Sequence, residues 1–130
     1  EIGSGLVGSE MCIRDSKNVV LFDKVQTPHY NYVGDSVLGY RAHMGAGSIT
    51  SNVKSDKTLV VVKNGAERIE TGMKKFGAIL GDCVEVGCNS VLNPGSVIGR
   101  RASVYPTSSV RGQVPADSIY KSAEEIVKRD

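Results

Sequence analysis

A six-residue repeat in the second half of the chain most constrains its fold. An aliphatic residue recurs at every sixth position, at Leu80, Val86, Leu92, Ile98, Val104 and Val110. A small or β-branched residue follows each of them four positions later, at Val84, Ser90, Ser96, Ala102, Ser108 and Val114. Six residues are too few for a helix and its return, so each unit is a short strand with a corner. Successive units then stack into a parallel β-helix whose aliphatic positions form one continuous core.

Glycine is frequent directly after the aliphatic position, at Gly81, Gly87 and Gly99. A bulky Cβ would crowd a corner, and glycine also reaches backbone angles that are closed to other residues. We therefore expect these glycines to supply the conformation of the corners.

The same aliphatic column extends upstream, at Tyr32, Leu38 and Met44, and it breaks between Thr50 and Ile79. Continuing the count through this stretch would bury three charged residues, Asp56, Arg68 and Lys74. Desolvation opposes the burial of unpaired charges. Residues 51–79 are therefore predicted to leave the coil as an excursion.

Two local patterns predict further elements. In the excursion, TLVVVK (58–63) and AERIET (66–71) flank Asn64-Gly65, a dipeptide that favours a two-residue hairpin turn, so we expect a projecting β-hairpin. Near the C-terminus, Ser122 and Glu125 form an S-x-x-E capping box before Ile126, which predicts a short helix over 122–130.

The first sixteen residues carry neither a repeat nor a helical or strand pattern, and LVGSEMCIRDS resembles a translated sequencing adapter. We exclude 1–16 from the fold; the alternative is a genuine flexible terminus. The predicted organisation is a leader over 1–16, a β-helix over 17–121 and a helix over 122–130.

Composition narrows the possible partners. A chain of 130 residues has room for one core, and a formal net charge of +2 with dispersed basic residues gives no support for a nucleic-acid partner. No apolar run approaches the ~20 residues that cross a bilayer, so we expect no membrane partner and a cytoplasmic location. Two histidines are too few for a three-histidine zinc site, and the cysteine spacing matches no common zinc signature, so no metal is expected.

The segment PHYNYVGDSVLGYRAHMGAGSITSN (28–52) resembles the acetyltransferase domain of the bifunctional N-acetylglucosamine-1-phosphate uridyltransferase/glucosamine-1-phosphate acetyltransferases. Residues in register with that family are His29, Tyr32, Gly34, Asp35, Gly39, the GAG corner of 45–47, Thr50 and Asn52. The resemblance covers Lys17 to about Arg111. It implies an all-β, left-handed parallel β-helix, usually a homotrimer with sites at subunit boundaries. The excursion is more similar to archaeal-type relatives of UDP-N-acetylglucosamine pyrophosphorylases.

The resemblance also implies a reaction, in which the amine of glucosamine 1-phosphate attacks the thioester of acetyl-CoA during UDP-N-acetylglucosamine synthesis. It makes His29 the catalytic base, because an imidazole accepts a proton near neutral pH. The implied substrate-binding residues are Lys17, Tyr32, Asn52, His43 in place of a family asparagine, and Lys57 beside the position of a second family lysine. Those implied for acetyl-CoA are Cys88, Pro106 and Arg111.

Three functions remain open from the sequence. The first is this acetyltransferase domain. The second is a β-helical trimerisation module of a sugar-phosphate nucleotidyltransferase, without chemistry of its own, since a shared fold does not fix function. The third is another hexapeptide acyltransferase with an amino acid acceptor, which would not need the HxxYxGD motif. The glycine-rich nucleotide loop and the α/β domain of a uridyltransferase are missing, so we expect no uridyltransferase in this chain. Because Lys17 opens in the middle of a coil, we expect the chain to begin within a longer protein.

Overall fold

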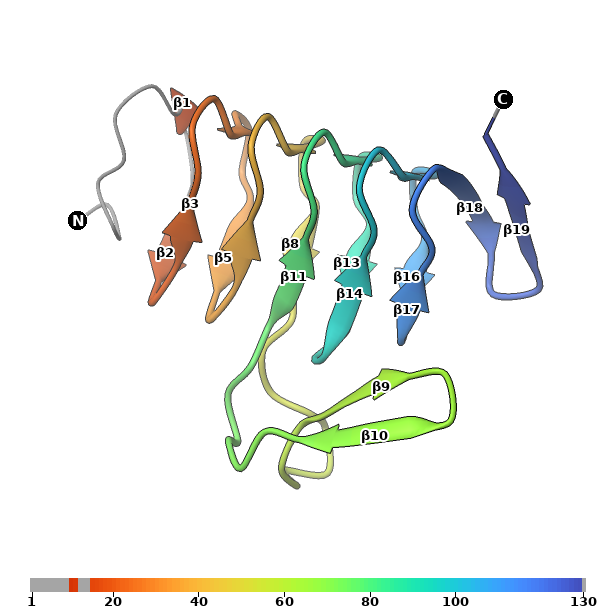
Figure 1. Cartoon of the computed structure of the whole chain (residues 1–130). Coiled ribbons are helices and arrows are strands. Elements are labelled where there is room, and N and C mark those ends of the chain that lie inside the picture. The colour runs from red at the N-terminus through yellow and green to blue at the C-terminus, as the bar shows by residue number, and fades with distance from the viewer. Residues whose placement is uncertain (1–9, 12–14, 130) are drawn as a thin grey trace.

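The computed structural model describes residues 10–11 and 15–129, and for residues 10–11 and 15–17 it describes the backbone only. The coil consists of very short strands separated by corners (Figure 1). In chain order they are β1 (Glu10–Met11), β2 (Asp15–Lys17), β3 (Val20–Leu21), β4 (Gln26–Thr27), β5 (Tyr32–Gly34), β6 (Val37–Leu38), β7 (His43–Met44), β8 (Ile49–Thr50), β11 (Ala78–Leu80), β12 (Glu85–Val86), β13 (Val91–Leu92), β14 (Ser96–Ile98), β15 (Ser103–Val104), β16 (Ser109–Val110), β17 (Gln113–Val114) and β18 (Ser118–Ser122).

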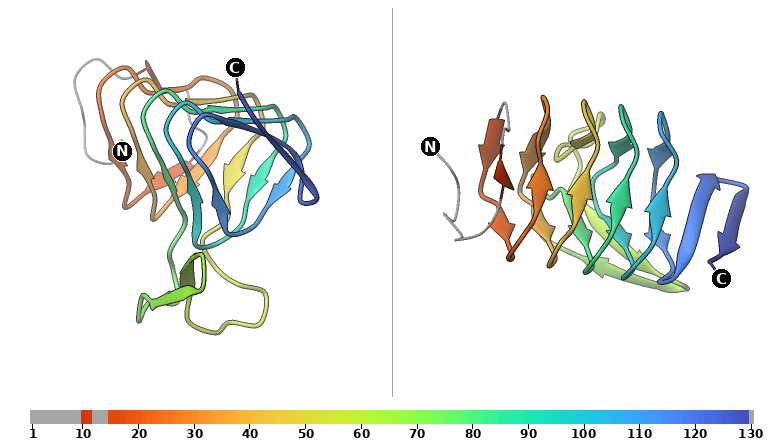
Figure 2. Two further views of the ribbon diagram at one scale, coloured as in Figure 1. Left: turned by 45° about the vertical axis from the view of Figure 1, so that its right-hand side comes forward. Right: turned by 90° about the horizontal axis from the view of Figure 1, so that it is seen from above.

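Each strand pairs in parallel with the strand one coil further, which gives the coil three faces around a triangular cross-section (Figure 2). Face A holds β1, β4, β7, β12, β15 and β18; face B holds β2, β5, β8, β13 and β16; face C holds β3, β6, β11, β14 and β17. The predicted all-β parallel solenoid is confirmed. The left-handed sense of the coil stays a prediction.

The repeat lines the core as expected, because the aliphatic residues from Leu80 to Val110 are at most 4% exposed. Leu38 and Met44 continue the column and are fully buried. The assignment of Tyr32 to this column is wrong. Its neighbour Val33 is buried instead, and Tyr32 is half-buried on the outside of face B. The coil advances by five residues between Val33 and Leu38, which shifts the inward register by one position.

For the repeat glycines, the predicted crowding by a Cβ is confirmed, but the predicted special backbone angles are wrong. Positive φ values occur two positions later, mostly at residues other than glycine, as at Cys83, Asn89 and Thr107. The glycines instead allow the coils to approach one another. A Cβ on Gly87 would lie 2.7 Å from Cα of Pro106 in the next coil, closer than real Cβ contacts.

The excursion leaves the coil after β8 and returns at β11, as predicted, and it contains the antiparallel hairpin of β9 (Val61–Asn64) and β10 (Glu67–Glu70). Asn64 pairs with Glu67, so the turn residues are Gly65 and Ala66, one position later than expected. Gly65 has a φ of 62°, as the first position of a type II′ turn requires. The hairpin projects from the edge between faces B and C and extends along the coil below β14 and β17 (Figures 1 and 2).

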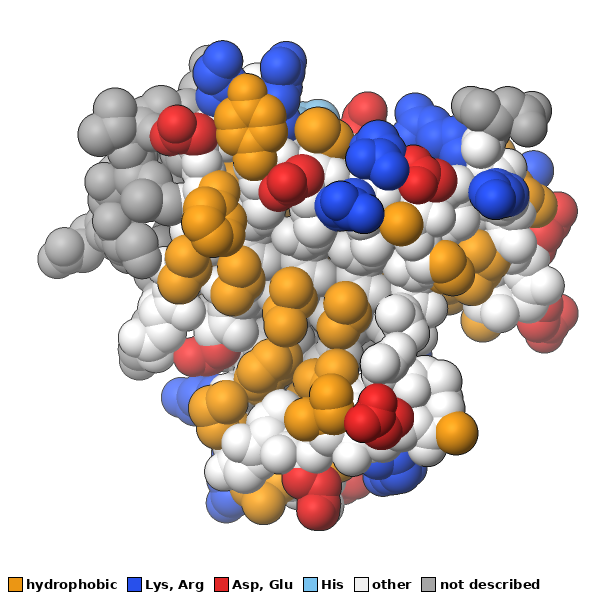
Figure 3. Space-filling view, viewed as in Figure 1, with side chains coloured by type: hydrophobic (Ala, Val, Ile, Leu, Met, Phe, Trp, Pro, Cys, Tyr) orange, Lys and Arg blue, Asp and Glu red, His pale blue; other side chains and the backbone are white. Residues whose placement is uncertain are grey.

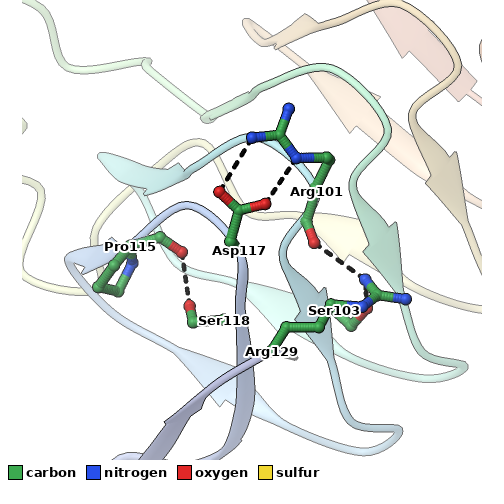
Figure 4. A network of polar contacts seen from close by, with 6 residues as sticks. All are labelled: Arg101, Ser103, Pro115, Asp117, Ser118 and Arg129. Atoms are coloured by element: carbon green, nitrogen blue, oxygen red, sulfur yellow. Dashed lines mark hydrogen bonds and ion pairs between the residues drawn. The ribbon is translucent and has the colours of Figure 1, made fainter.

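The predicted C-terminal helix is wrong. Residues 118–128 form a second antiparallel hairpin, in which β19 (Glu125–Lys128) covers the free edge of β18 on face A. Ser122 Oγ accepts a hydrogen bond from the Glu124 N–H at 3.3 Å, the local bond of a turn rather than of a helix cap. Arg101 and Asp117 form an ion pair beside this hairpin, and Arg129 donates to the Arg101 carbonyl at 2.9 Å (Figure 4).

Two coil strands lie in the segment that the sequence sets apart as a leader. β1 pairs with β4 and β2 pairs with β5. Residues 1–9 and 12–14 lie outside the described part of the chain, and their adapter origin stays a prediction. Residues 10–11 and 15–129 contain no helix with the length and apolar character needed to cross a bilayer.

Candidate functional site

His29 lies at the corner that connects β4 on face A to β5 on face B. Its backbone is held from both sides, because its N–H donates to Asn31 Oδ1 at 3.2 Å and its carbonyl accepts from the Gly47 N–H at 2.9 Å. Asn31 is fully buried and donates to the Gly45 carbonyl at 2.8 Å. The His29 side chain is exposed and forms no hydrogen bond with the described residues. A fixed backbone therefore presents an imidazole that a ligand can contact.

Two of the three residues predicted for acetyl-CoA share an edge of the prism with His29. Backbone hydrogen bonds stack the corners along this A–B edge, from His29 to Ala46, Cys88 and Pro106 in successive coils. Cys88 lies two coils from His29, about 10 Å at the spacing of paired strands. Its thiol is free and exposed. The edge thus aligns the predicted base with the positions predicted for the acetyl donor.

A second cluster lies at the B–C edge and contains Tyr32 and Asn52. Asn52 Nδ2 donates to the Tyr32 hydroxyl at 3.1 Å and to Asp35 Oδ2 at 2.6 Å. Asn18 Nδ2 donates to Asp35 Oδ1 at 3.2 Å. Gly34 leaves room for this arrangement, since a Cβ there would lie 2.9 Å from Asn52 Nδ2. The structure therefore brings Tyr32 and Asn52 together, at the far side of face B from the His29 corner.

The other predicted residues are more dispersed. His43 is half-buried on face A, where it pairs in register with Gln26 and Glu85. Lys57 is exposed in a turn of the excursion. Lys17 pairs with Gly34 at the B–C edge, and its side chain lies outside the described residues. Arg111 lies on the B–C edge and not on the edge of Cys88 and Pro106.

Two further residues, Asp35 and Asn31, have structural roles that the sequence does not predict. Asp35 holds the Asn52 amide, and buried Asn31 holds the corner that carries His29. Both lie inside the segment of 28–52, so a signal was present for each. Asp35 belongs to the motif that resembles the family, without a role of its own there. Asn31 lies at a corner position, and an asparagine at such a position does not suggest burial. Of the residues that the structure describes, no three of His, Cys, Asp or Glu are grouped so that they could hold a metal ion.

Comparison with known proteins identifies relatives of the same kind. A bifunctional sugar-1-phosphate nucleotidylyltransferase/acetyltransferase from Sulfurisphaera tokodaii is 33% identical over 115 residues, which are 88% of this chain and 28% of that protein. The bifunctional protein GlmU from Methanococcus aeolicus is 32% identical over 113 residues, or 86% of this chain and 27% of that protein. The chain therefore spans little more than a quarter of the length of these relatives. No family model matches it.

A solved structure supports the fold. The chain superposes on the serine acetyltransferase of Neisseria gonorrhoeae with a TM-score of 0.63, covering 85% of this chain and 38% of that protein at 20% sequence identity. This likeness concerns the coil alone. The repeat, the three-faced coil and these relatives together show that the chain is a hexapeptide-repeat β-helix related to the acetyltransferase domain of the GlmU-type bifunctional sugar-1-phosphate nucleotidylyltransferase/acetyltransferases.

Proposed function

We propose that this chain is an acetyltransferase region that moves acetyl from acetyl-CoA to the amine of a sugar phosphate, glucosamine 1-phosphate. The observation that carries the proposal is the His29 corner, where buried Asn31 fixes the backbone and the imidazole remains exposed. The relatives support it, since their names include an acetyltransferase. The Tyr32–Asn52–Asp35 cluster gives face B a second set of polar groups for a sugar.

In the proposed reaction, the nitrogen of the neutral acceptor amine attacks the thioester carbonyl carbon while the His29 imidazole takes one proton from that nitrogen. Collapse of the tetrahedral intermediate then leaves a C–N bond in place of the C–S bond. The coenzyme thiolate leaves and takes the proton from the imidazolium, so the histidine returns to its neutral form. The uncharged imidazole accepts the proton and the imidazolium returns it, as general acid–base catalysis near neutral pH requires. Tyr32 and Asn52 orient the sugar, and Cys88 and Pro106 border the acetyl donor.

Kinetics of a His29→Ala variant test the proposal. We expect kcat for acetyl transfer to fall roughly 100-fold or more, the usual effect of removing a general base. His43→Ala is the matched comparison, because it removes the other imidazole, which lies on face A. Its effect is expected on KM for the sugar phosphate rather than on kcat. Equal turnover by the parent and His29→Ala would contradict the assigned role.

The second candidate is an assembly module without chemistry, and the outward surface of the coil favours it. Face C exposes a row of aliphatic residues in register, Val20, Val37, Ile79 and Val97. Such a surface suits association of copies, and we propose a homotrimer for either function. A trimer that turns over no acetyl-CoA with any amino sugar phosphate would favour the module.

A further inference from the structure

We propose that the cavity between the β9–β10 hairpin and the B–C edge is a binding site for a small ligand that carries phosphate groups. The cavity has a volume of about 300 Å³. Its lining comes from the excursion and from the corners of two coils, and comprises Lys54, Val61, Lys63, Arg68, Asn93, Pro94, Gly95, Arg111 and Gly112. The site goes beyond the proposed function, because it does not depend on acetyl transfer.

The charge of this lining is uniform. Four side chains are cationic, namely Lys54, Lys63, Arg68 and Arg111, and none of the described lining residues is acidic. These four residues come from different segments: the start of the excursion, β9, β10 and the corner after β16. The formal net charge of the chain is only +2, so this concentration of cations is local. Cations that converge on one cavity favour a ligand with more than one negative charge.

No protein carboxylate forms an ion pair with these cations in the described part of the chain, although the charge of Lys54, after the hydrogen bonds from Thr58, helps to lower the pKa of Asp56. The ion pair found among the described residues joins Arg101 to Asp117, on the edge between faces C and A. Glu70 shares a hairpin face with Arg68 by strand alternation, but it does not line the cavity and forms no ion pair in the described part of the chain. Lysine and arginine at this site are therefore available to an external anion.

The hairpin also places two like charges together. Lys63 and Arg68 are direct cross-strand partners, and like charges in that position destabilise a hairpin. A bound anion removes this repulsion, because it accepts hydrogen bonds from both side chains. Packing keeps the hairpin in place, since Val60 is fully buried and Gly95 lies so close to the hairpin that a Cβ there would be 2.8 Å from the Val61 carbonyl oxygen.

The size of the cavity points to phosphate groups of a small molecule. A volume of about 300 Å³ is at the lower end of ligand pockets. Arg68 and Arg111 each offer the planar fork that binds phosphate oxygens in pairs. Both proposed substrates carry phosphate, as the sugar 1-phosphate and as the phosphates of the coenzyme. The Tyr32–Asn52–Asp35 cluster lies on the same edge of the coil, two coils away.

Isothermal titration calorimetry of the 130-residue chain with inorganic diphosphate tests the site. We expect saturable binding that weakens as salt is raised. Arg111→Gln, and Lys63→Gln with Arg68→Gln, are each expected to weaken binding roughly 10-fold or more, because each removes charge-assisted hydrogen bonds. Lys74→Gln is the control, since it removes one positive charge from the same excursion at an exposed position outside the cavity. It is expected to bind like the parent.

Thermal melting without ligand separates binding from folding. The Lys63→Gln, Arg68→Gln variant is expected to melt no lower than the parent, because the substitutions relieve a like-charge pair. Titration with coenzyme A, 3′-dephospho-coenzyme A and glucosamine 1-phosphate then identifies the source of the phosphate. Absence of diphosphate binding overturns the proposal, as does equal binding by the parent and the cavity variants. The proposal is also overturned if the cavity variants lose chain association but still bind diphosphate. That result would indicate that the cations contact an acidic protein surface. None of these measurements involves turnover, so they leave the test of His29 independent.

Discussion

Two buried threonines show how strongly the core depends on individual hydrogen bonds. Thr27 and Thr50 both occupy inward positions of the coil and are fully buried. The Thr27 hydroxyl has no hydrogen-bond partner in the described part of the chain. The Thr50 hydroxyl accepts from the Gly34 N–H at 3.1 Å and from Ser36 Oγ at 2.9 Å. The threonine hydroxyl is therefore unpaired at Thr27 and hydrogen-bonded at Thr50.

Replacement of each threonine by valine is expected to have opposite effects. Thr27→Val removes an unpaired buried hydroxyl and should raise the free energy of unfolding by about 1 kcal/mol. Thr50→Val removes the hydroxyl that accepts from the Gly34 N–H, while the Ser36 hydroxyl keeps the Gly34 carbonyl as an acceptor, and should lower the free energy of unfolding by about 1–3 kcal/mol. Chemical denaturation of the two variants measures both values. A loss of stability in Thr27→Val would mean that its hydroxyl is satisfied in solution.

The close approach between coils and the positive φ values at the corners lead to further predictions for single residues. Gly87→Ala should lower the free energy of unfolding by about 1–3 kcal/mol, because the new methyl group meets the backbone of Pro106. Thr107 is a β-branched residue with a φ of 58°, a conformation that asparagine tolerates better. Thr107→Asn should therefore raise stability by up to about 1 kcal/mol. A Gly87→Ala variant as stable as the parent would contradict the close approach between the coils.

These residues also show what the sequence predicts and what it does not. The strict spacing from Leu80 to Val110 predicted the core column, because one inward side chain per strand is the simplest way to fill a narrow prism. The five-residue step from Val33 to Leu38 was missed, since Tyr32 also fits a six-residue count. The reason for the glycines was missed because composition does not distinguish a positive φ from a close approach between coils.

At the scale of elements, a surface ion pair lies beside the C-terminal hairpin. Arg101 donates to both carboxylate oxygens of Asp117, with Nε at 2.6 Å from Oδ1 and Nη2 at 2.9 Å from Oδ2 (Figure 4). The hydrogen bonds from Arg101, together with its charge, hold the pKa of Asp117 below its usual value. The pair is exposed, so its contribution to stability is small.

The lowered pKa fixes how this contribution depends on pH. A carboxylate whose pKa is lower in the folded state stabilises the fold above its unfolded pKa, and the stabilisation disappears as the pH falls through the folded pKa. Asp117→Asn should therefore melt slightly below the parent at about pH 7, and the difference should vanish at about pH 2. Glu124→Gln is the control in the same hairpin. A difference that persists in acid would indicate that the substitution acts on packing rather than on the ion pair.

The sequence predicts the hairpin of the excursion better than it predicts the C-terminal end of the coil. Asn64-Gly65 predicted the β9–β10 hairpin because its flanking segments suit strands, and only the turn position shifted. The capping box at Ser122 predicted a helix because local signals favour one there. The exposed edge of β18 offers unpaired backbone groups that an adjoining segment can satisfy, and this tertiary pairing outweighs the local signal.

For the molecule as a whole, the candidate residues of the sequence fall into two sets that lie on different edges. His29, Cys88 and Pro106 share the A–B edge, whereas Tyr32 contacts Asn52 at the B–C edge, and the role of each set stays a prediction. Lys57 is predicted from its distance along the chain, and the excursion that follows Asn52 removes that relation. The cationic cavity was not foreseen, because its four charges lie in segments that only the folded hairpin brings together.

The three faces of the prism differ in what they offer to another copy. Face A presents polar residues outward, among them Gln26, His43 and Glu85. Face C presents the aliphatic row of Val20, Val37, Ile79 and Val97, and hydrophobic side chains gather over this face in Figure 3. Contiguous apolar surface of this kind marks an interaction site. We therefore expect copies of the chain to associate through face C.

Ile79→Arg tests this association, because Ile79 lies in the middle of the row and is half-buried already in one chain. An unpaired charge in an apolar interface is costly, so the variant should sediment as a monomer where the parent sediments as a trimer. Its circular dichroism should stay unchanged, since the side chain points away from the core. Glu85→Arg on face A is the control and should remain trimeric. A trimeric Ile79→Arg would exclude face C, and loss of acetyl transfer together with the trimer would place the site at a subunit boundary.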